Sequence, residues 1–211
     1  MNESVFDPQA QIGNPDLKII ASLERLSEGF RVLLWEKAKV LGISPIQIQI
    51  LIFVRFHSDD KCKVSYLAKE FCLTKPTVSE AVKSLEQKGF IERQTEIKDT
   101  RSHTIHLTEA GKSAVAQTAN FANPMLGSLT KIPAAEKGIL LEQLLGVVRQ
   151  LQGAGIIGMQ RMCFNCAHYR PGQEGHRHFC QLLNAALNTA DLRMDCAEHL
   201  ATAREVIFQE T

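Results

Sequence analysis

The sequence predicts a mainly α-helical protein with one small β-hairpin and a cysteine-rich tail. Apolar residues recur at helical spacing through most of residues 16–152. Two β-prone runs, Phe90 to Thr95 and Thr104 to Thr108, interrupt this helical pattern once. Beyond the helical region the composition changes, because four of the six cysteines and four of the seven histidines fall within residues 162–199.

Composition sets only broad limits on function. Hydrophobic content of 45% and charged content of 22% are ordinary for a globular protein. No apolar run reaches the roughly 18 residues of a membrane span, and the N-terminus lacks the features of a signal peptide. We therefore expect a cytoplasmic protein with no membrane partner. The net charge of +1 does not indicate nucleic-acid binding, but ten Lys and Arg against seven Asp and Glu over residues 61–112 permit phosphate contacts.

The N-terminal part of the chain predicts an arm followed by two helices. Residues 1–15 are mostly polar and contain proline and glycine, so we expect a flexible arm. From Leu17 to Leu41 the apolar residues keep helical spacing over about seven turns, and Gly42 ends the pattern. The segment Ser44 to Gln47 is typical of a capping box with proline at the first helical position. The apolar run Ile46 to Phe56 can be a buried strand or a buried helix, and this cap favours the helix.

The segment from Lys63 to Gly89 predicts two short helices joined by a tight turn. We expect Ser65 to open the first helix, Thr74 to cap the second and Gly89 to end it. The polar face of the second helix consists of Lys75, Thr77, Ser79, Glu80, Lys83, Ser84 and Gln87. Small hydroxyls and cations toward the N-terminal half are typical of a helix-turn-helix recognition helix, whose residues meet base edges in the major groove. A solvated polar face is, however, common to any amphipathic helix pair.

The two β-prone runs follow this helix pair directly, and a hairpin in that position is a wing. Together these segments resemble the MarR family of bacterial winged-helix regulators over roughly residues 16–152, without the tail. The matching positions are Leu85, Gly89, Ile91, Arg93, Asp99, Arg101, Leu107, Thr108 and Gly111. The resemblance implies a winged helix-turn-helix domain with N- and C-terminal dimerisation helices. It also implies a homodimeric repressor that binds a palindromic operator in double-stranded DNA and responds to a small-molecule or redox effector.

Eight residues are predicted to contact DNA. They are Lys75, Thr77, Ser79, Glu80, Lys83, Arg93, Lys98 and Arg101. We expect the hydroxyls and Lys83 to face bases, Lys75 to face the backbone and Glu80 to accept from a cytosine amino group. At the wing tip, Arg101 is expected to lie in or along the minor groove, while Asp99 shapes the tip by pairing with one of the wing arginines.

Two more helices are predicted after the wing. Thr108 is expected to cap a helix from Glu109 to about Ala122, and Pro133 and Ala134 open another. The apolar stripe of the last helix consists of Ile139, Leu140, Leu141, Leu144, Leu145, Val147, Val148 and Leu151. Such a helix can cover its own winged domain, but surplus apolar width on helices at both ends of that domain favours a homodimer.

A run of three closely spaced glycines precedes the tail, which we place at residues 159–211. Its cysteines are Cys163, Cys166, Cys180 and Cys196. Two thiolates of a C-x2-C pair can reach one ion from a tight turn, and the two distant cysteines can complete a tetrahedral site. His176, His178 or His199 can instead supply nitrogen, and in particular His199 can replace Cys180 as the fourth ligand. Four unmetallated thiols are a further alternative. Zinc is the first expectation, because its binding energy can replace the missing core of a small unit. The spacing is also similar to that of high-potential iron-sulfur proteins, so a [4Fe-4S] cluster is the second.

Two functions of different classes are compatible with these features. The first is a transcriptional regulator whose metal centre is structural or senses redox state or metal. The second is a redox or metal-carrier protein that uses the winged domain as a protein-interaction scaffold. Cys62 and Cys72, which flank the first helix of the pair, can be packing residues or redox-sensing thiols. An enzyme is not expected, because the sequence has no Gly-rich phosphate loop, paired catalytic carboxylates or nucleophile motif.

Overall fold

The structure is a computed structural model that describes residues 4–95, 103–158 and 160–202. Its contacts group the chain into two units. One unit consists of residues 1–56, 81–94 and 105–126, and the other of residues 57–80, 95–104 and 127–211. The division of the sequence into a winged domain and a separate tail stays a prediction. In the structure, the tail belongs to the same unit as the first helix of the predicted pair.

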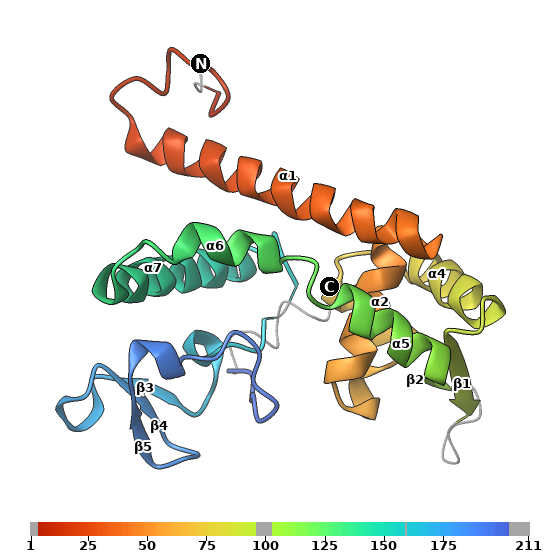
Figure 1. Cartoon of the computed structure of the whole chain (residues 1–211). Helices are drawn as coiled ribbons and strands as arrows, with labels where there is room; N and C mark the ends of the chain where they lie inside the picture. The colour runs from red at the N-terminus through yellow and green to blue at the C-terminus, as the bar shows by residue number, and fades with distance from the viewer. Residues whose placement is uncertain (1–3, 96–102, 159, 203–211) are drawn as a thin grey trace. The chain divides into compact units, whose positions relative to one another are not determined.

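The first unit begins with helices α1 Pro15–Leu41 and α2 Pro45–Phe56. Figure 1 shows α1 as one long, uninterrupted helix. The predicted capping box is present, since the Ser44 N–H donates to Gln47 Oε1 at 2.8 Å and the Gln47 N–H donates to Ser44 Oγ at 3.4 Å. In the described part of the chain no single helix has the length and apolarity of a membrane span. Only α1 and α2 taken together, bent by 90° at their junction, meet that test by length and composition.

Helix α5 Glu109–Thr118 packs against both α1 and α2. It ends earlier than the predicted Ala122, because the chain turns at Ala119 and then forms the 3-10 helix Asn123–Met125 around Pro124. The core of this unit contains the fully buried residues Ile48, Ile50, Leu51, Leu85 and Ile105. These are aliphatic residues from α2, from the end of the predicted recognition helix and from the hairpin, as the sequence pattern predicts.

The hairpin consists of strands β1 Ile91–Thr95 and β2 His103–Leu107, which form a two-stranded sheet. Ile91 and Ile105 are buried, at 2% and 1% exposure, so each strand contributes one apolar side chain to the core. Thr108 closes the hairpin onto α5. Its hydroxyl donates to the Gly89 carbonyl at 2.6 Å and accepts from the Gly111 N–H at 3.1 Å, while its own N–H donates to the Phe90 carbonyl at 3.1 Å.

The predicted helix pair is present as α3 Val64–Glu70 and α4 Lys75–Gln87. The expectation that Ser65 opens α3 is wrong: the helix starts one residue earlier, with Lys63 at the N-cap and no side-chain capping bond. Thr74 does cap α4, since its Oγ1 accepts from the Thr77 N–H at 3.3 Å. Gly89 ends the segment with a φ of 74°, a left-handed conformation that favours glycine.

The second unit contains α3 and the C-terminal part of the chain. After the short helix α6 Leu126–Leu129 comes α7 Ala134–Gly153. The tail then forms an antiparallel sheet in the order β3 Tyr169–Pro171, β4 His178–Cys180 and β5 Ala185–Leu187 (Figure 1). Four 3-10 segments complete the described part of this unit: Asp59–Lys61, Cys163–Asn165, Gln173–Gly175 and Thr189–Asp191.

The tail has a small hydrophobic core that it shares with α7. Leu145 of α7 packs with Met162 and Leu192, all three less than 8% exposed, and Leu141 and Val148 line the same cluster. The wide apolar stripe of α7 is therefore used partly by the tail, an arrangement that the sequence does not predict. The remaining part of the stripe stays exposed, at Ile139, Leu140 and Leu144.

Candidate nucleic-acid interface and cysteine cluster

Helix α4 separates a buried apolar stripe from an exposed polar face. Val78, Val82 and Leu85 are at most 1% exposed. The five residues of α4 predicted to contact DNA are all exposed, namely Lys75, Thr77, Ser79, Glu80 and Lys83. The hydroxyls of Thr74 and Thr77 lie 2.8 Å apart, so the capping residue also orients one residue of this face.

The wing places Arg93 against the end of α4. Its guanidinium donates to Glu86 Oε2 from Nη2 at 2.6 Å and from Nε at 3.0 Å. From the sequence, Arg93 is one of the two wing arginines expected to pair with Asp99. Lys98, Asp99 and Arg101 all lie outside the described residues, so their predicted roles stay predictions.

The tail brings its four cysteines into one region. Cys163 and Cys166 share a turn in which the Cys166 N–H donates to the Cys163 carbonyl at 3.0 Å, and Cys180 pairs with Tyr169 in the sheet. The Arg193 N–H donates to Cys163 Sγ at 3.2 Å, three residues before Cys196. Burial raises the pKa of the Cys163 thiol. The N–H of Arg193 lowers it, and the charges of the other three tail thiols raise it further.

The four thiols are thus near enough to interact electrostatically, and thiolates are the ligand type that zinc and iron-sulfur clusters prefer. As the side chains stand, no group of three or more His, Cys, Asp or Glu among the described residues is arranged to hold a metal ion. A metal centre would therefore require the four thiols to converge further than they do in this structure.

His199, the alternative fourth ligand, is engaged elsewhere. Its Nε2 lies 3.2 Å from Asn165 Oδ1 and 3.3 Å from the Asn165 carbonyl oxygen, and both atoms are acceptors, so Nε2 carries the proton. Asn165 is itself buried and donates from Nδ2 to Gln152 of α7. Burial lowers the pKa of His199. Only Nδ1 of this histidine could serve as a metal ligand in the observed orientation.

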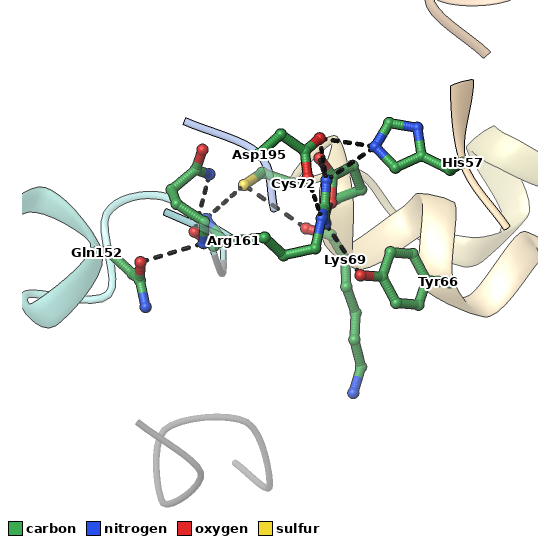
Figure 2. A network of polar contacts seen from close by, with 10 residues as sticks. His57, Tyr66, Lys69, Cys72, Gln152, Arg161 and Asp195 are labelled. Atoms are coloured by element: carbon green, nitrogen blue, oxygen red, sulfur yellow. Dashed lines mark hydrogen bonds and ion pairs between the residues drawn. The ribbon is translucent and has the colours of Figure 1, made fainter. Parts of the chain in front are cut away.

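A buried arginine that the sequence analysis did not identify lies at the start of the tail. Arg161 is 6% exposed, and Figure 2 shows its side chain extending between Asp195 of the tail and Tyr66 of α3. The guanidinium donates from Nε and Nη2 to the two oxygens of Asp195 at 2.7 and 2.9 Å. It donates from Nη1 and Nη2 to the two oxygens of Glu70 at 2.7 and 3.2 Å, and from Nη1 to Tyr66 Oη at 2.9 Å. All five N–H groups of the guanidinium therefore have an acceptor.

The charges in this group reinforce one another. Burial opposes ionisation of Asp195, but hydrogen bonds from Arg161 and His57 lower its pKa. His57 Nε2 lies 2.6 Å from Asp195 Oδ2 and donates to it, because a carboxylate can only accept. Although burial works against the charged form of Arg161, its carboxylate partners raise its pKa. We call Arg161, Asp195, Glu70, Tyr66 and His57 the Arg161 cluster.

Gly158, the last of the three glycines before the tail, also contacts α3 and the turn that follows it. The Gly158 N–H donates to Cys72 Sγ at 3.1 Å (Figure 2), and a Cβ added at Gly158 would lie 2.6 Å from the Lys69 carbonyl oxygen. Only glycine permits this close approach. Cys72 is exposed, whereas Cys62 is buried, and burial together with Asp59 and Asp60 raises the pKa of Cys62 to about 11.

A second ionic group, centred on the buried carboxylate of Glu142, binds the tail to α7. Glu142 is 8% exposed and accepts from His178 Nε2 at 2.6 Å, from Thr189 Oγ1 at 3.0 Å and from Arg177. Burial opposes the ionised form of Glu142, but these donors lower its pKa. Tyr169 Oη lies 2.6 Å from the other ring nitrogen of His178, so both nitrogens of this histidine are engaged.

The helix pair, its exposed second helix and the following hairpin define a winged-helix fold. The MarR family model matches residues 41–102, which span the second helix, the helix pair and the start of the wing. The fold is also similar to that of solved MarR-type proteins. A MepR–DNA complex from S. aureus has 24% sequence identity and a TM-score of 0.55, covering 62% of this chain and 96% of that chain.

Two further structures agree with this assignment of the fold. A MarR transcriptional regulator from Methanosarcina mazei Go1 has 21% identity and a TM-score of 0.54, covering 64% of this chain and 96% of that chain. The transcriptional regulator BldR from Sulfolobus solfataricus has 20% identity and a TM-score of 0.51, covering 64% of this chain and 95% of that chain. These proteins match nearly along their whole length, while more than a third of this chain has no counterpart in them.

Proposed function

We propose that this protein is a DNA-binding transcriptional regulator that reads double-stranded DNA with α4. The observation that carries this proposal is the exposed face of α4, which presents two lysines, two hydroxyls and one carboxylate opposite a buried stripe. Side chains of these types recognise base edges and phosphates in the major groove. Similarity of the fold to MepR, which has been solved as a DNA complex, supports the same reading.

We propose a homodimer as the active form, acting as a repressor on a palindromic operator. Large apolar side chains are exposed on α1 at Ile19, Ile20, Leu26, Phe30, Val32 and Trp35. Association of two copies through such faces would remove them from water and present two α4 helices. Two recognition helices about 34 Å apart reach successive major grooves, so the operator would contain two half-sites about one helical turn apart.

We further propose that the four tail cysteines bind one metal centre, zinc as the first expectation and a [4Fe-4S] cluster as the second. Cys163, Cys166, Cys180 and Cys196 supply four thiolates, and His199 already uses Nε2 to bind Asn165. This supports the all-cysteine ligand set over the set that contains His199. Bound metal would cross-link three separate stretches of the tail and order a unit that has only a small core.

Equilibrium binding to the promoter next to the protein's own gene tests the DNA proposal. Lys83→Ala should weaken binding to that duplex by about 1 to 3 kcal/mol while changing binding to a scrambled duplex much less, because a base contact carries sequence information. Lys112→Ala is the matched control, since it removes the same charge from an exposed position on α5 outside the helix pair. An equal loss on both duplexes for Lys83→Ala would refute its assignment to base readout.

The metal proposal is tested on protein purified without oxygen, by metal analysis and an absorption spectrum. Cys180→Ser should abolish stoichiometric metal, and His199→Gln should leave it in place. Visible absorption with iron and sulfide would identify the cluster, and a colourless protein with one zinc per chain would identify zinc. Retention of metal in Cys180→Ser together with its loss in His199→Gln would assign the alternative ligand set.

A further inference from the structure

Arg161 connects the cysteine region of the tail to the first helix of the helix pair. Its Nε and Nη2 donate to the two oxygens of Asp195, and its Nη1 donates to Tyr66 of α3 (Figure 2). Nη1 and Nη2 also donate to Glu70 of α3. The Arg161 side chain is 6% exposed and that of Glu70 is 18% exposed, so the bonds between them are largely shielded from water, whereas the side chain of Asp195 is 44% exposed. A buried, fully bonded guanidinium between two carboxylates fixes both partners in position, because an error in either geometry would leave buried donors or acceptors unpaired.

The tail end of this connection is built into the cysteine region. Asp195 directly precedes Cys196, and the Cys196 N–H donates to the Arg161 carbonyl at 2.8 Å. Two residues after Arg161, the Cys163 N–H donates to the Arg193 carbonyl at 3.0 Å, and the Arg193 N–H returns a bond to Cys163 Sγ. The stretches that carry Cys163 and Cys196 are thus hydrogen-bonded to each other beside Arg161, so a change in how these stretches are arranged would move the backbone from which the Arg161 side chain extends.

The other end of the connection is a helix that needs outside support. Helix α3 has only seven residues and no side-chain bond at its N-cap. Helices this short are not stable by themselves and depend on tertiary contacts. Tyr66 and Glu70 lie one turn apart on α3, and Gly158 contacts Lys69 and Cys72 at its C-terminal end. Contacts from Arg161 of the tail and from Gly158 just before it therefore hold the C-terminal half of α3.

We propose that Arg161 couples the four tail cysteines, Cys163, Cys166, Cys180 and Cys196, to the helix pair α3 and α4. Disruption of the arrangement of these cysteines then destabilises α3 and weakens DNA binding. Arg161 acts here as a positioning residue, since it binds α3, the helix that precedes the proposed recognition helix α4. It is not itself predicted to contact DNA. The inference rests on the proposed function for its link to DNA and to a metal centre. The coupling of the thiols to α3 can be measured without either.

Hydrogen exchange of the α3 backbone amides tests the coupling. In the otherwise unchanged protein, Cys163→Ser should accelerate their exchange by roughly 10- to 100-fold, because perturbing the tail cysteines is expected to break the charge-assisted bonds from Arg161 to α3. Arg161→Lys keeps the positive charge but supplies only three donors, so α3 should already exchange fast in this variant and Cys163→Ser should add little. Arg177→Lys is the matched control in the same tail. Because Arg177 binds Glu142 and not α3, Cys163→Ser should retain its full effect in that background.

A second variant leaves the cysteines intact. Coupling is reciprocal, so Glu70→Ala on α3 should accelerate exchange of the Cys196 amide, which donates to the Arg161 carbonyl. Unchanged Cys196 exchange in Glu70→Ala would overturn the proposal, as would an equal response of α3 to Cys163→Ser with and without Arg161. If the protein bound neither operator DNA nor metal, the proposed function would fail while these exchange measurements would still decide the coupling.

Discussion

Replacing Gly111 by alanine tests the account of how the wing is fixed to the helical domain. A Cβ at this position would lie 2.0 Å from the Phe90 carbonyl oxygen, 3.1 Å from its carbon and 3.2 Å from Leu107 Cδ2. Ordinary contacts between carbon and oxygen are about 3.3 Å or longer, so α5 and the hairpin would have to separate by roughly 1 Å. The Phe90 oxygen cannot retreat freely, because it accepts from the Thr108 N–H at 3.1 Å.

The expected cost combines two effects. Overpacking of this kind costs about 1 to 3 kcal/mol, and loss of the Thr108 cap costs about 1 kcal/mol more. Gly111→Ala should therefore lower the free energy of unfolding by about 2 to 4 kcal/mol, a large part of the stability of a typical domain. Urea denaturation followed by the fluorescence of the single tryptophan, Trp35 on α1, measures this change.

Gly29→Ala in α1 is the matched control, because no atom lies within 4 Å of its added Cβ. This substitution should be neutral or stabilise the helix by up to about 1 kcal/mol. If Gly111→Ala unfolded at the same urea concentration as the unmodified protein, the close approach of α5 to Phe90 would be wrong. The explanation of why glycine occupies this position would then fail with it.

Three further predictions concern the wing, the tail and the two cysteines that flank α3. Arg101→Ala should weaken binding to all DNA sequences and make the log-log salt slope shallower by roughly one unit, and unchanged affinity in a folded protein would remove the wing from the interface. Glu142→Gln should destabilise the tail by about 1 to 3 kcal/mol, seen as faster proteolysis after residue 153, whereas Glu136→Gln on the exposed part of α7 should not. Native alkylation mapped by mass spectrometry should modify Cys72 but spare Cys62, whose pKa of about 11 leaves roughly 100-fold less thiolate at pH 8 than an ordinary thiol with a pKa of 9.0. The rate at Cys62 should then rise with pH until about 11, and rapid modification near neutral pH would contradict its burial.

Local signals in the sequence predicted the helical part of the fold well. The capping residues Ser44 and Thr74 and the terminating Gly89 act over a few residues, and each is present in the structure. The error at Ser65 has the same local origin. A good capping residue is passed over because α3 is held by tertiary contacts and starts at Val64 without a side-chain cap.

The sequence could not predict which surfaces the tail would use. Arg161 and Glu70 are separated by 91 residues, and no periodicity or spacing relates them. The apolar stripe of α7 was visible, but its division between Leu145, which packs on Met162, and the exposed Ile139 depends on the tertiary fold. The cysteine spacing predicted one shared metal centre, which stays a prediction, whereas the hydrogen bonding of His199 to Asn165 required coordinates. For the contacts of Arg161, the only available signal in the sequence was its positive charge, placed between the three glycines and Cys163, the first cysteine of the tail.

The central claim is that this protein recognises a specific DNA sequence, and the affinity of the unmodified protein for two duplexes tests it most directly. Fluorescence anisotropy would compare a duplex from the promoter next to its own gene with a scrambled duplex of the same composition, at two salt concentrations. The promoter duplex should bind roughly 1,000-fold or more tightly than the scrambled one, and both affinities should fall as salt rises. Equal affinities for the two duplexes, or no binding to either at low salt, would contradict it.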